Sequence, residues 1–169
     1  MPSRQVIVFA LIAVVVLGAV VAGALYVNRG AHVELRGSIQ KVRIQGVDDK
    51  SAIAVVDFRF ANPSDHPFVV RSVTVLIEDT QGNSHEGMSI ADVDVARVFQ
   101  YYPLLGGKFN ESLKIRDKVP AKETLDRMIS ARFEVPASLL ESRRKLTIRV
   151  EEVDGNVSEI VEEPEAPKR

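Results

Sequence analysis

The sequence predicts a mainly β protein, an antiparallel β-sandwich that follows an apolar helix. An uncharged run occupies residues 6–27, and apolar and polar side chains alternate over much of residues 32–161. Gly, Pro, Asn and Asp separate the alternating runs. Such alternation is typical of half-buried strands, and these residue types favour turns. We therefore expect a short tail at residues 1–5, the helix at 6–27, one folded domain at 32–161, and a polar, proline-rich, disordered tail at 162–169.

Residues 6–27 are long enough to cross a membrane. At about 1.5 Å of rise per residue the run reaches roughly 33 Å, and the hydrocarbon core of a bilayer is about 30 Å thick. Arg4 and Arg29 flank the run, and Tyr26 stands where an aromatic ring meets the headgroups. A cleavable signal is the alternative, because Ala-Gly-Ala at residues 22–24 has the form of a cleavage site. We favour a retained single-pass anchor, since the run is longer than the core of a typical signal.

Charge and composition limit the classes of partner. The net charge is −1, and the short basic cluster at residues 143–145 is far smaller than a nucleic-acid surface requires. The absence of cysteine rules out disulfides, thiol nucleophiles and Cys-ligated metals. More basic residues follow the anchor than precede it, and this count favours a cytoplasmic domain, but long folded domains cross membranes largely regardless of charge. We expect the domain on the extracytoplasmic (periplasmic or extracellular) side.

Three strands are predicted in the first half of the domain. They cover residues 33–45, 52–61 and 68–79. Gly37 is expected to place a bulge or kink in the first strand. The second strand is expected to be half-buried, because apolar side chains alternate there with charged Asp57 and Arg59. Prolines end it within residues 62–67, and Thr-Gln-Gly-Asn at residues 80–83 predicts a hairpin turn after the third strand.

The middle of the domain breaks the alternation. In residues 89–102, Ser89 and Asp92 have the spacing of a helix N-terminal cap, and apolar side chains recur at roughly helical spacing. We expect either a helix of two or three turns or an irregular strand. Residues 104–107 are expected to form a flexible break.

The second half of the domain is predicted as strands joined by short turns. The strands are residues 111–116, 125–135, 145–153 and 157–161. A turn is expected around Pro120, a helical turn at 136–142 with Pro136 at its first position, and a hairpin turn at 154–155. About seven short strands with at most one helix favour an immunoglobulin-like or fibronectin-like sandwich. Tryptophan and the cysteine pair of antibody domains are absent.

Two places resemble the late-embryogenesis-abundant type 2 family and the related water-stress-hypersensitive-response (WHy) domain. Residues 58–79 resemble the family's strand, Asn-Pro turn and following apolar strand, and residues 118–135 resemble its proline-containing turn and return strand. The residues that match the motif are Asn62, Pro63, Pro67 and Pro120. The resemblance implies a β-sandwich without catalytic residues and a role in stress protection or binding. Residues 89–108 depart from the family pattern.

The titratable residues do not form a known catalytic or metal-binding motif. The histidines are His32, His66 and His85, which lack the spacing of metal ligands. The carboxylate pairs are Asp48 and Asp49, Asp92 and Asp94, and Glu151 and Glu152, which lack the pattern of a calcium loop. Neither a nucleophile elbow nor a phosphate-binding loop is present. We therefore predict no enzymatic activity, no cofactor and no metal site.

The densest aromatic stretch is the candidate interaction patch. Its residues are Phe99, Tyr101, Tyr102, Leu104 and Leu105. Such side chains suit an exposed surface that meets a partner or a membrane. The alternative, which we favour, is that they cover one end of the core, because buried aromatics dominate small cores.

The function that the sequence favours is a membrane-anchored, non-enzymatic binding or structural module of the cell envelope, in contact with another protein or an envelope polymer. A stress-protection protein is the second hypothesis, and a subunit of a larger membrane complex is the third. The sequence leaves the ligand and the oligomeric state open.

Overall fold

The computed structural model describes residues 5, 13–23 and 34–162. The chain divides into two compact units, Met1–Val33 and Glu34–Arg169. In the first unit, residues 13–23 are helical and their side chains are exposed. Within the described residues, no helix is both long and apolar enough to cross a membrane. The description therefore covers half of the predicted anchor and the first two residues of the predicted cleavage site. It does not cover the C-terminal tail beyond Glu162.

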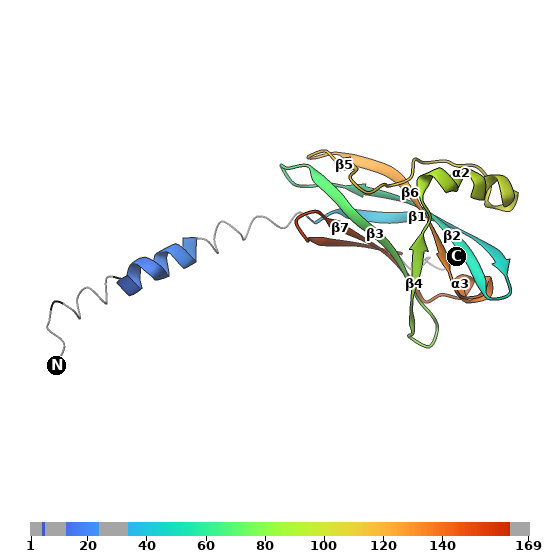
Figure 1. Cartoon of the computed structure of the whole chain (residues 1–169), viewed down its shortest axis with the longest axis horizontal. Helices are drawn as coiled ribbons and strands as arrows, with labels where there is room; N and C mark the ends of the chain where they lie inside the picture. Colours follow the sequence, from blue (N-terminus) through green and yellow to red (C-terminus); the bar gives the residue numbers. More distant parts are fainter. Residues whose placement is uncertain (1–4, 6–12, 24–33, 163–169) are drawn as a thin grey trace, which may run out of the picture. The chain divides into compact units, whose positions relative to one another are not determined.

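The second unit is built on one curled antiparallel sheet (Figure 1). Its strands are β1 (Arg36–Asp48), β2 (Ser51–Ala61), β3 (Phe68–Glu78), β4 (Ser84–Ser89), β5 (Lys118–Val119), β6 (Thr124–Phe133), β7 (Lys145–Glu152) and β8 (Val157–Val161). Its helices are α2 (Asp92–Tyr101), the 3₁₀ turn η1 (Pro103–Leu105) and α3 (Ala137–Glu141). Neighbouring strands follow the order β1-β2-β6-β4-β3-β7-β8, and β5 pairs with the start of β3.

Curling brings the two edge strands of the sheet together. The backbone N–H of Leu35, just before β1, donates a 2.9 Å hydrogen bond to Ser158 Oγ on β8. The halves β1-β2-β6 and β3-β7-β8 are joined through β4, which pairs with both β3 and β6. The prediction of a mainly β, sandwich-like domain is confirmed, and the immunoglobulin-like or fibronectin-like topology stays a prediction.

Most predicted strands are observed within a few residues of their expected bounds, but the strand at residues 111–116 and the bulge at Gly37 are not observed. Residues 111–116 are not a strand: they make a single bridge, from Ser112 to Met128, because the chain turns at Arg116, whose φ is 70°. Gly37 does not form the bulge of β1, since it pairs with Phe60 and the register shifts further along the strand. The hairpin turns at 80–83 and 154–155 are confirmed.

Strand β2 is buried on both faces except at Arg59, so the prediction of a half-buried strand is wrong. Val55 is 0% exposed and Asp57 is 4% exposed, although both lie on the face that was expected to meet solvent. The helix α2 and the turn η1 cover this face, with Val95 and Leu105 packed in the same buried cluster as Val55. The segment that breaks the alternation thus completes the core.

That segment folds as a helix, as one of the two interpretations predicted, but its cap differs. Ala91 is the N-cap residue and makes no side-chain cap. Ser89 still belongs to β4, and its hydroxyl donates to the carbonyl oxygen of Val73 at 2.8 Å. The flexible break predicted after the helix is instead the turn η1, which buries Leu105. Pro136 precedes α3 as its N-cap residue rather than starting it.

Candidate functional site

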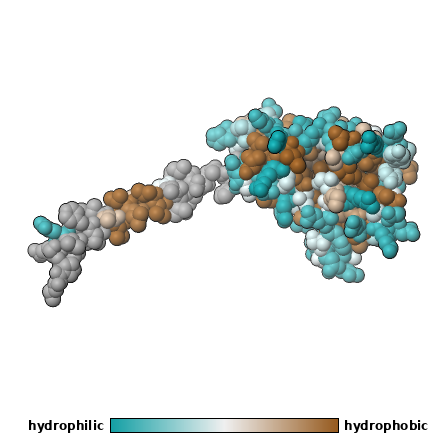
Figure 2. Space-filling view, in the orientation of Figure 1, coloured by the Kyte–Doolittle hydropathy of each residue, from teal (hydrophilic) through white to brown (hydrophobic). Residues whose placement is uncertain are grey.

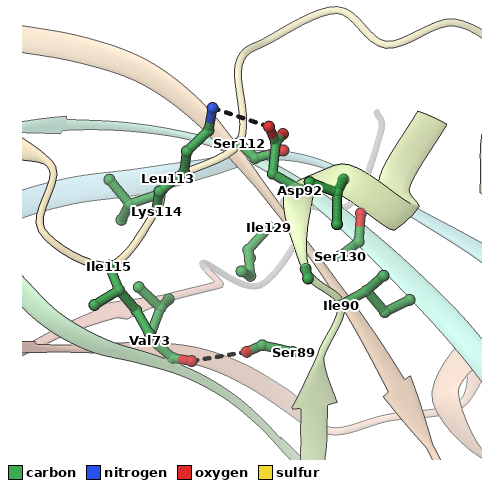
Figure 3. A pocket seen from close by; sticks show the side chains of 12 residues that line it. Val73, Ser89, Ile90, Asp92, Ser112, Leu113, Lys114, Ile115, Ile129 and Ser130 are labelled. Atoms are coloured by element: carbon green, nitrogen blue, oxygen red, sulfur yellow. Dashed lines mark hydrogen bonds and ion pairs between the residues drawn. The ribbon is translucent and has the colours of Figure 1, made fainter.

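A pocket of about 530 Å³ opens where β3 and β6 separate (Figure 3). Strand β4 lies between β3 and β6 in the sheet and ends at Ser89. Beyond this point the start of α2 and residues 112–115 line the space between the two strands. The pocket is therefore a product of the sheet's topology and of the chain segment that follows β4.

The walls of the pocket are mainly aliphatic. Leu113 and Ile129 are buried, and Ile90 is half-buried. At the mouth, Val93 is 80% exposed and Ile115 is 67% exposed. Figure 2 shows apolar surface, in brown, over the part of the domain where β5, β6 and α2 lie in Figure 1. Large aliphatic side chains in this pattern suit an apolar ligand.

One ion pair stands at the edge of the pocket. Lys114 Nζ lies 2.9 Å from Asp92 Oδ2, and Lys108 Nζ lies 3.4 Å from Asp92 Oδ1. The hydrogen bond from Lys114, with the Ser112 hydroxyl and the Lys108 charge beside it, lowers the pKa of Asp92 to about 2, although burial opposes the shift. Asp92 in turn raises the pKa of Lys114. Both groups are therefore charged at neutral pH and compensate each other.

The serines of the pocket wall offer little to a ligand. The Ser89 hydroxyl is used by the carbonyl of Val73. Ser130 is 1% exposed, and its hydroxyl has no hydrogen-bond partner within the part of the chain that the structure describes. The surface that the pocket presents is therefore apolar and uncharged, apart from the paired Asp92 and Lys114.

Most members of the three carboxylate pairs considered in the sequence make internal contacts. Asp92 binds the two lysines, and Asp94 pairs with Arg97 at 3.3 Å. Asp48 accepts hydrogen bonds from Lys50 and Ser51. Glu151 pairs with Arg71 at 3.2 Å, while Glu152 is buried. In residues 5, 13–23 and 34–162, no group of three His, Asp or Glu side chains is placed to hold a metal ion.

The two described histidines lie apart, one in a turn and the other in strand β4. His66 is exposed in the turn between β2 and β3, where its carbonyl accepts a hydrogen bond from Asn62. His85 Nε2 lies 3.3 Å from Asp79 Oδ2 beside the β3–β4 hairpin turn. His32 lies outside the described residues. The structure thus brings neither described histidine to the pocket.

The structure divides the predicted interaction patch into two sets. Leu105 is buried, and Phe99 and Tyr102 are half-buried against the cluster on the outer face of β2. Tyr101 and Leu104 are 76% and 90% exposed. The first set covers the core, as one interpretation predicted, and the second set is exposed, as the other interpretation predicted. Neither interpretation accounts for all five residues.

The two places that resemble the late-embryogenesis-abundant type 2 family lie together. Asn62 is fully buried, and its Nδ2 donates to the carbonyl oxygens of His66 at 2.8 Å and Val119 at 3.1 Å. Its backbone N–H donates to Glu123, and its carbonyl accepts from Lys122. Asn62 therefore joins the turn after β2 to the turn after β5. The three motif prolines, Pro63, Pro67 and Pro120, are exposed.

Sequence reasoning did not single out the pocket residues as a site; it named only Asp92, in a carboxylate pair, and Ser89, as a helix cap. Val93, Ile115 and Ser130 each fit a local alternating or helical pattern, so the pattern alone does not mark them.

Comparison with known proteins finds fold likeness only. No family model matches the chain, and no curated protein matches it. An uncharacterised β-sandwich protein from Clostridium difficile 630 aligns with a TM-score of 0.40 and 8% identity, over 77% of this chain and 86% of that chain. The archaellum periplasmic stator protein FlaG from Sulfolobus acidocaldarius aligns with a TM-score of 0.33 and 10% identity, over 75% of this chain and 98% of that chain. Both TM-scores are below 0.5, so neither likeness bears on function.

Proposed function

We propose that this protein is a non-enzymatic binding module whose pocket between β3 and β6 receives an apolar, uncharged ligand. The observation that carries the proposal is the pocket itself. Its volume of about 530 Å³ falls in the range of small-ligand sites, and its walls are aliphatic. Its lysine is already paired with Asp92, which leaves the hydrophobic effect as the main source of affinity.

Isoleucine-methyl NMR of the full chain in lipid nanodiscs tests this proposal, with toluene as the probe. We expect saturable shifts of the Ile90, Ile115 and Ile129 methyls. Ala91→Trp should abolish them, because Ala91 is exposed and lines the pocket, where an indole ring would fill the space. Ala96→Trp is the matched control, at an exposed alanine of the same helix. Shifts that do not saturate, or that survive Ala91→Trp, contradict the proposal.

Membrane anchoring by residues 6–27 is the second part of the proposal, with the domain on the extracytoplasmic side. The length and composition of this run support it. Fractionation of cells and protease treatment of intact cells test it. Recovery of the uncut chain from the soluble fraction without detergent would contradict the anchor. Protection of the domain in intact cells, with digestion after permeabilisation, would contradict its side.

Stress protection is a second candidate function, favoured by one observation. The two segments that resemble the stress-related family are joined by Asn62 in this structure. A heat-inactivation assay with a labile enzyme tests the candidate. The Asn62→Ala variant, in which the two turns are no longer joined, is assayed at the same concentration as the control. Retention of enzyme activity at equimolar ratio supports it, and inactivation at the rate seen without the protein removes it.

A further inference from the structure

Two lysines and one aspartate set the charge at the edge of the pocket. Lys114 is the only cation among the described residues that line the pocket, and its side chain is 49% exposed. Its ammonium lies 2.9 Å from Asp92 Oδ2 (Figure 3). Lys108 does not line the pocket, and its ammonium contacts Asp92 at 3.4 Å and Glu111 at 3.2 Å. The ammonium nearest the pocket is therefore already engaged by a carboxylate of the protein.

Asp92 changes the class of ligand that the rest of the pocket suits. Aliphatic walls with one ammonium at the edge suit a fatty acid, because the chain is buried while its carboxylate finds a counter-ion. With Asp92 in place, an incoming carboxylate loses hydration, meets a like charge and finds the ammonium of Lys114 already bonded. A neutral apolar molecule meets none of these costs.

The fold keeps Asp92 in this place and keeps it charged. Asp92 is the first residue of α2, where the helix dipole favours a negative charge. The hydrogen bond from Lys114 is the largest of the contacts that lower the pKa of Asp92 to about 2. The carboxylate is therefore ionised at neutral pH, and its repulsion of anions is always present there.

From this arrangement we infer that Asp92 determines the ligand class of the pocket: it occupies Lys114 and repels anions, so that the pocket binds a neutral apolar molecule in preference to a carboxylate of the same shape. The inference rests on the proposed function, since it requires that the pocket accept an apolar group. It assigns the selectivity to one side chain. Without the Asp92 carboxylate, Lys114 is available to an anionic ligand and the selectivity is lost.

The test compares hexanamide with hexanoate, which have nearly the same shape but differ in charge at neutral pH. Isoleucine-methyl NMR of the full chain in lipid nanodiscs gives both Kd values, and empty nanodiscs correct for probe that enters the lipid. In the parent protein, the Kd of hexanoate is expected to exceed that of hexanamide by about tenfold or more. Asp92→Asn should lower this ratio of Kd values by about tenfold or more, because Lys114 gains an anionic partner in the ligand. A change of the pocket that affects both probes alike cancels in the ratio.

Three further variants identify the cause of the selectivity. Asp92→Ala should lower the ratio in the same way, and it also removes the hydrogen bond that an asparagine could still make to Lys114. The double variant Asp92→Asn with Lys114→Gln should return the ratio to the parent value, because the counter-ion is gone. Asp94→Asn is the matched control: it removes the same charge from the same helix, but Asp94 does not line the pocket and pairs with Arg97. It should leave the ratio unchanged.

A parent ratio near one, or a ratio that neither Asp92 variant lowers, overturns this inference. If toluene and hexanamide still bind, the apolar pocket of the proposed function stands. A low ratio that persists in the double variant also overturns the inference, because another cation then holds the carboxylate. An equal fall in Asp94→Asn overturns it as well, since net charge then explains the selectivity. Failure of both toluene and hexanamide to bind the parent protein overturns the proposed function with it.

Discussion

Arg43 on β1 and Asp57 on β2 form a buried ion pair, with Nη2 2.7 Å from Oδ2. The Nη1 of Arg43 donates to the carbonyl oxygens of Leu105 at 2.6 Å and Gly107 at 2.7 Å. Asp57 also accepts a 2.9 Å hydrogen bond from Asn110. The pair therefore fastens the chain after α2 to the outer face of the sheet, where α2 completes the core.

Arg43→Met is expected to destabilise the domain by about 3–5 kcal/mol, because it leaves the buried Asp57 carboxylate without its counter-charge. It also removes the guanidinium that lies 5.2 Å from the centroid of the Phe99 ring and 5.0 Å from that of Phe109. Urea unfolding measures the loss. The matched control is Arg59→Met, which breaks an exposed pair with Asp126 and should cost much less. Equal losses would show that burial does not set the strength of the Arg43 contact.

Asn62→Ala is expected to cost about 3 kcal/mol of unfolding free energy, because the buried side-chain amide no longer donates to the carbonyl oxygens of His66 and Val119, and the Val119 carbonyl is itself buried. The change also frees the turn after β2 from the turn after β5. Thermal or urea unfolding measures the effect. Gln100→Ala, at an exposed amide on α2, should change stability by about 0.5 kcal/mol or less. A loss at Asn62 as small as this would mean that the amide does not join the two turns.

Gly37→Ala tests the close approach of β1 to β2. A Cβ at Gly37 would overlap the carbonyl oxygen of Arg59 and lie 2.8 Å from the Cβ of Phe60. The strands must move apart, at a cost of about 1–3 kcal/mol. Gly46→Ala, in the same strand, is the control, since its nearest contact is Ala137 Cβ at 3.6 Å. Chemical denaturation of both variants should therefore separate them, and similar stabilities would argue against the tight approach.

Most strands could be predicted from the sequence, but the segments that cover the sheet could not. Alternation is a local property, so most strands were predicted close to their bounds. The double burial of β2 was not, because charged Asp57 suggested a solvent face. Its partner Arg43 lies on another strand, and Leu105 and Gly107 lie after the helix that covers both. Only the tertiary arrangement makes a charged residue suitable for that face.

The pocket was beyond sequence reasoning for a related reason. It exists because β4 ends while β3 and β6 continue, and because residues 112–115 do not form the predicted strand. The ion pair of Asp92 and Lys114 joins residues whose spacing matches no local motif. By contrast, Asn62 was singled out from its turn, and the structure adds the partner turn that it binds.

Acid is expected to loosen the β3–β4 hairpin. Hydrogen bonds from the side chain and backbone of Asn83, with those from His85 and Gln81, hold the pKa of Asp79 well below its usual range, although burial opposes them. A lowered folded-state pKa stabilises the fold above the unfolded-state pKa of about 4, and this contribution is lost as the pH falls further.

Hydrogen-exchange protection factors of the hairpin amides should therefore fall between roughly pH 5 and pH 2. Asp79→Asn should flatten this fall, because the group no longer titrates. Asp65→Asn, at a side chain that is 85% exposed, should leave the fall as it is in the parent protein. A parent hairpin whose protection is independent of pH in this range would contradict the role of Asp79.

Ser130 and Ser158 together test how much a buried hydroxyl contributes to the free energy of unfolding. Both are at most 1% exposed, but Ser158 Oγ accepts the hydrogen bond from Leu35, whereas the Ser130 hydroxyl has no partner among the described residues. Ser158→Ala is expected to lose about 1 kcal/mol, since a buried N–H is left unpaired. Ser130→Ala should be neutral or stabilising by up to about 1 kcal/mol, because it removes a polar group whose burial is uncompensated. Urea unfolding measures the stability of both variants. A loss for Ser130→Ala equal to that for Ser158→Ala would show that the Ser130 hydroxyl has a hydrogen-bond partner in solution.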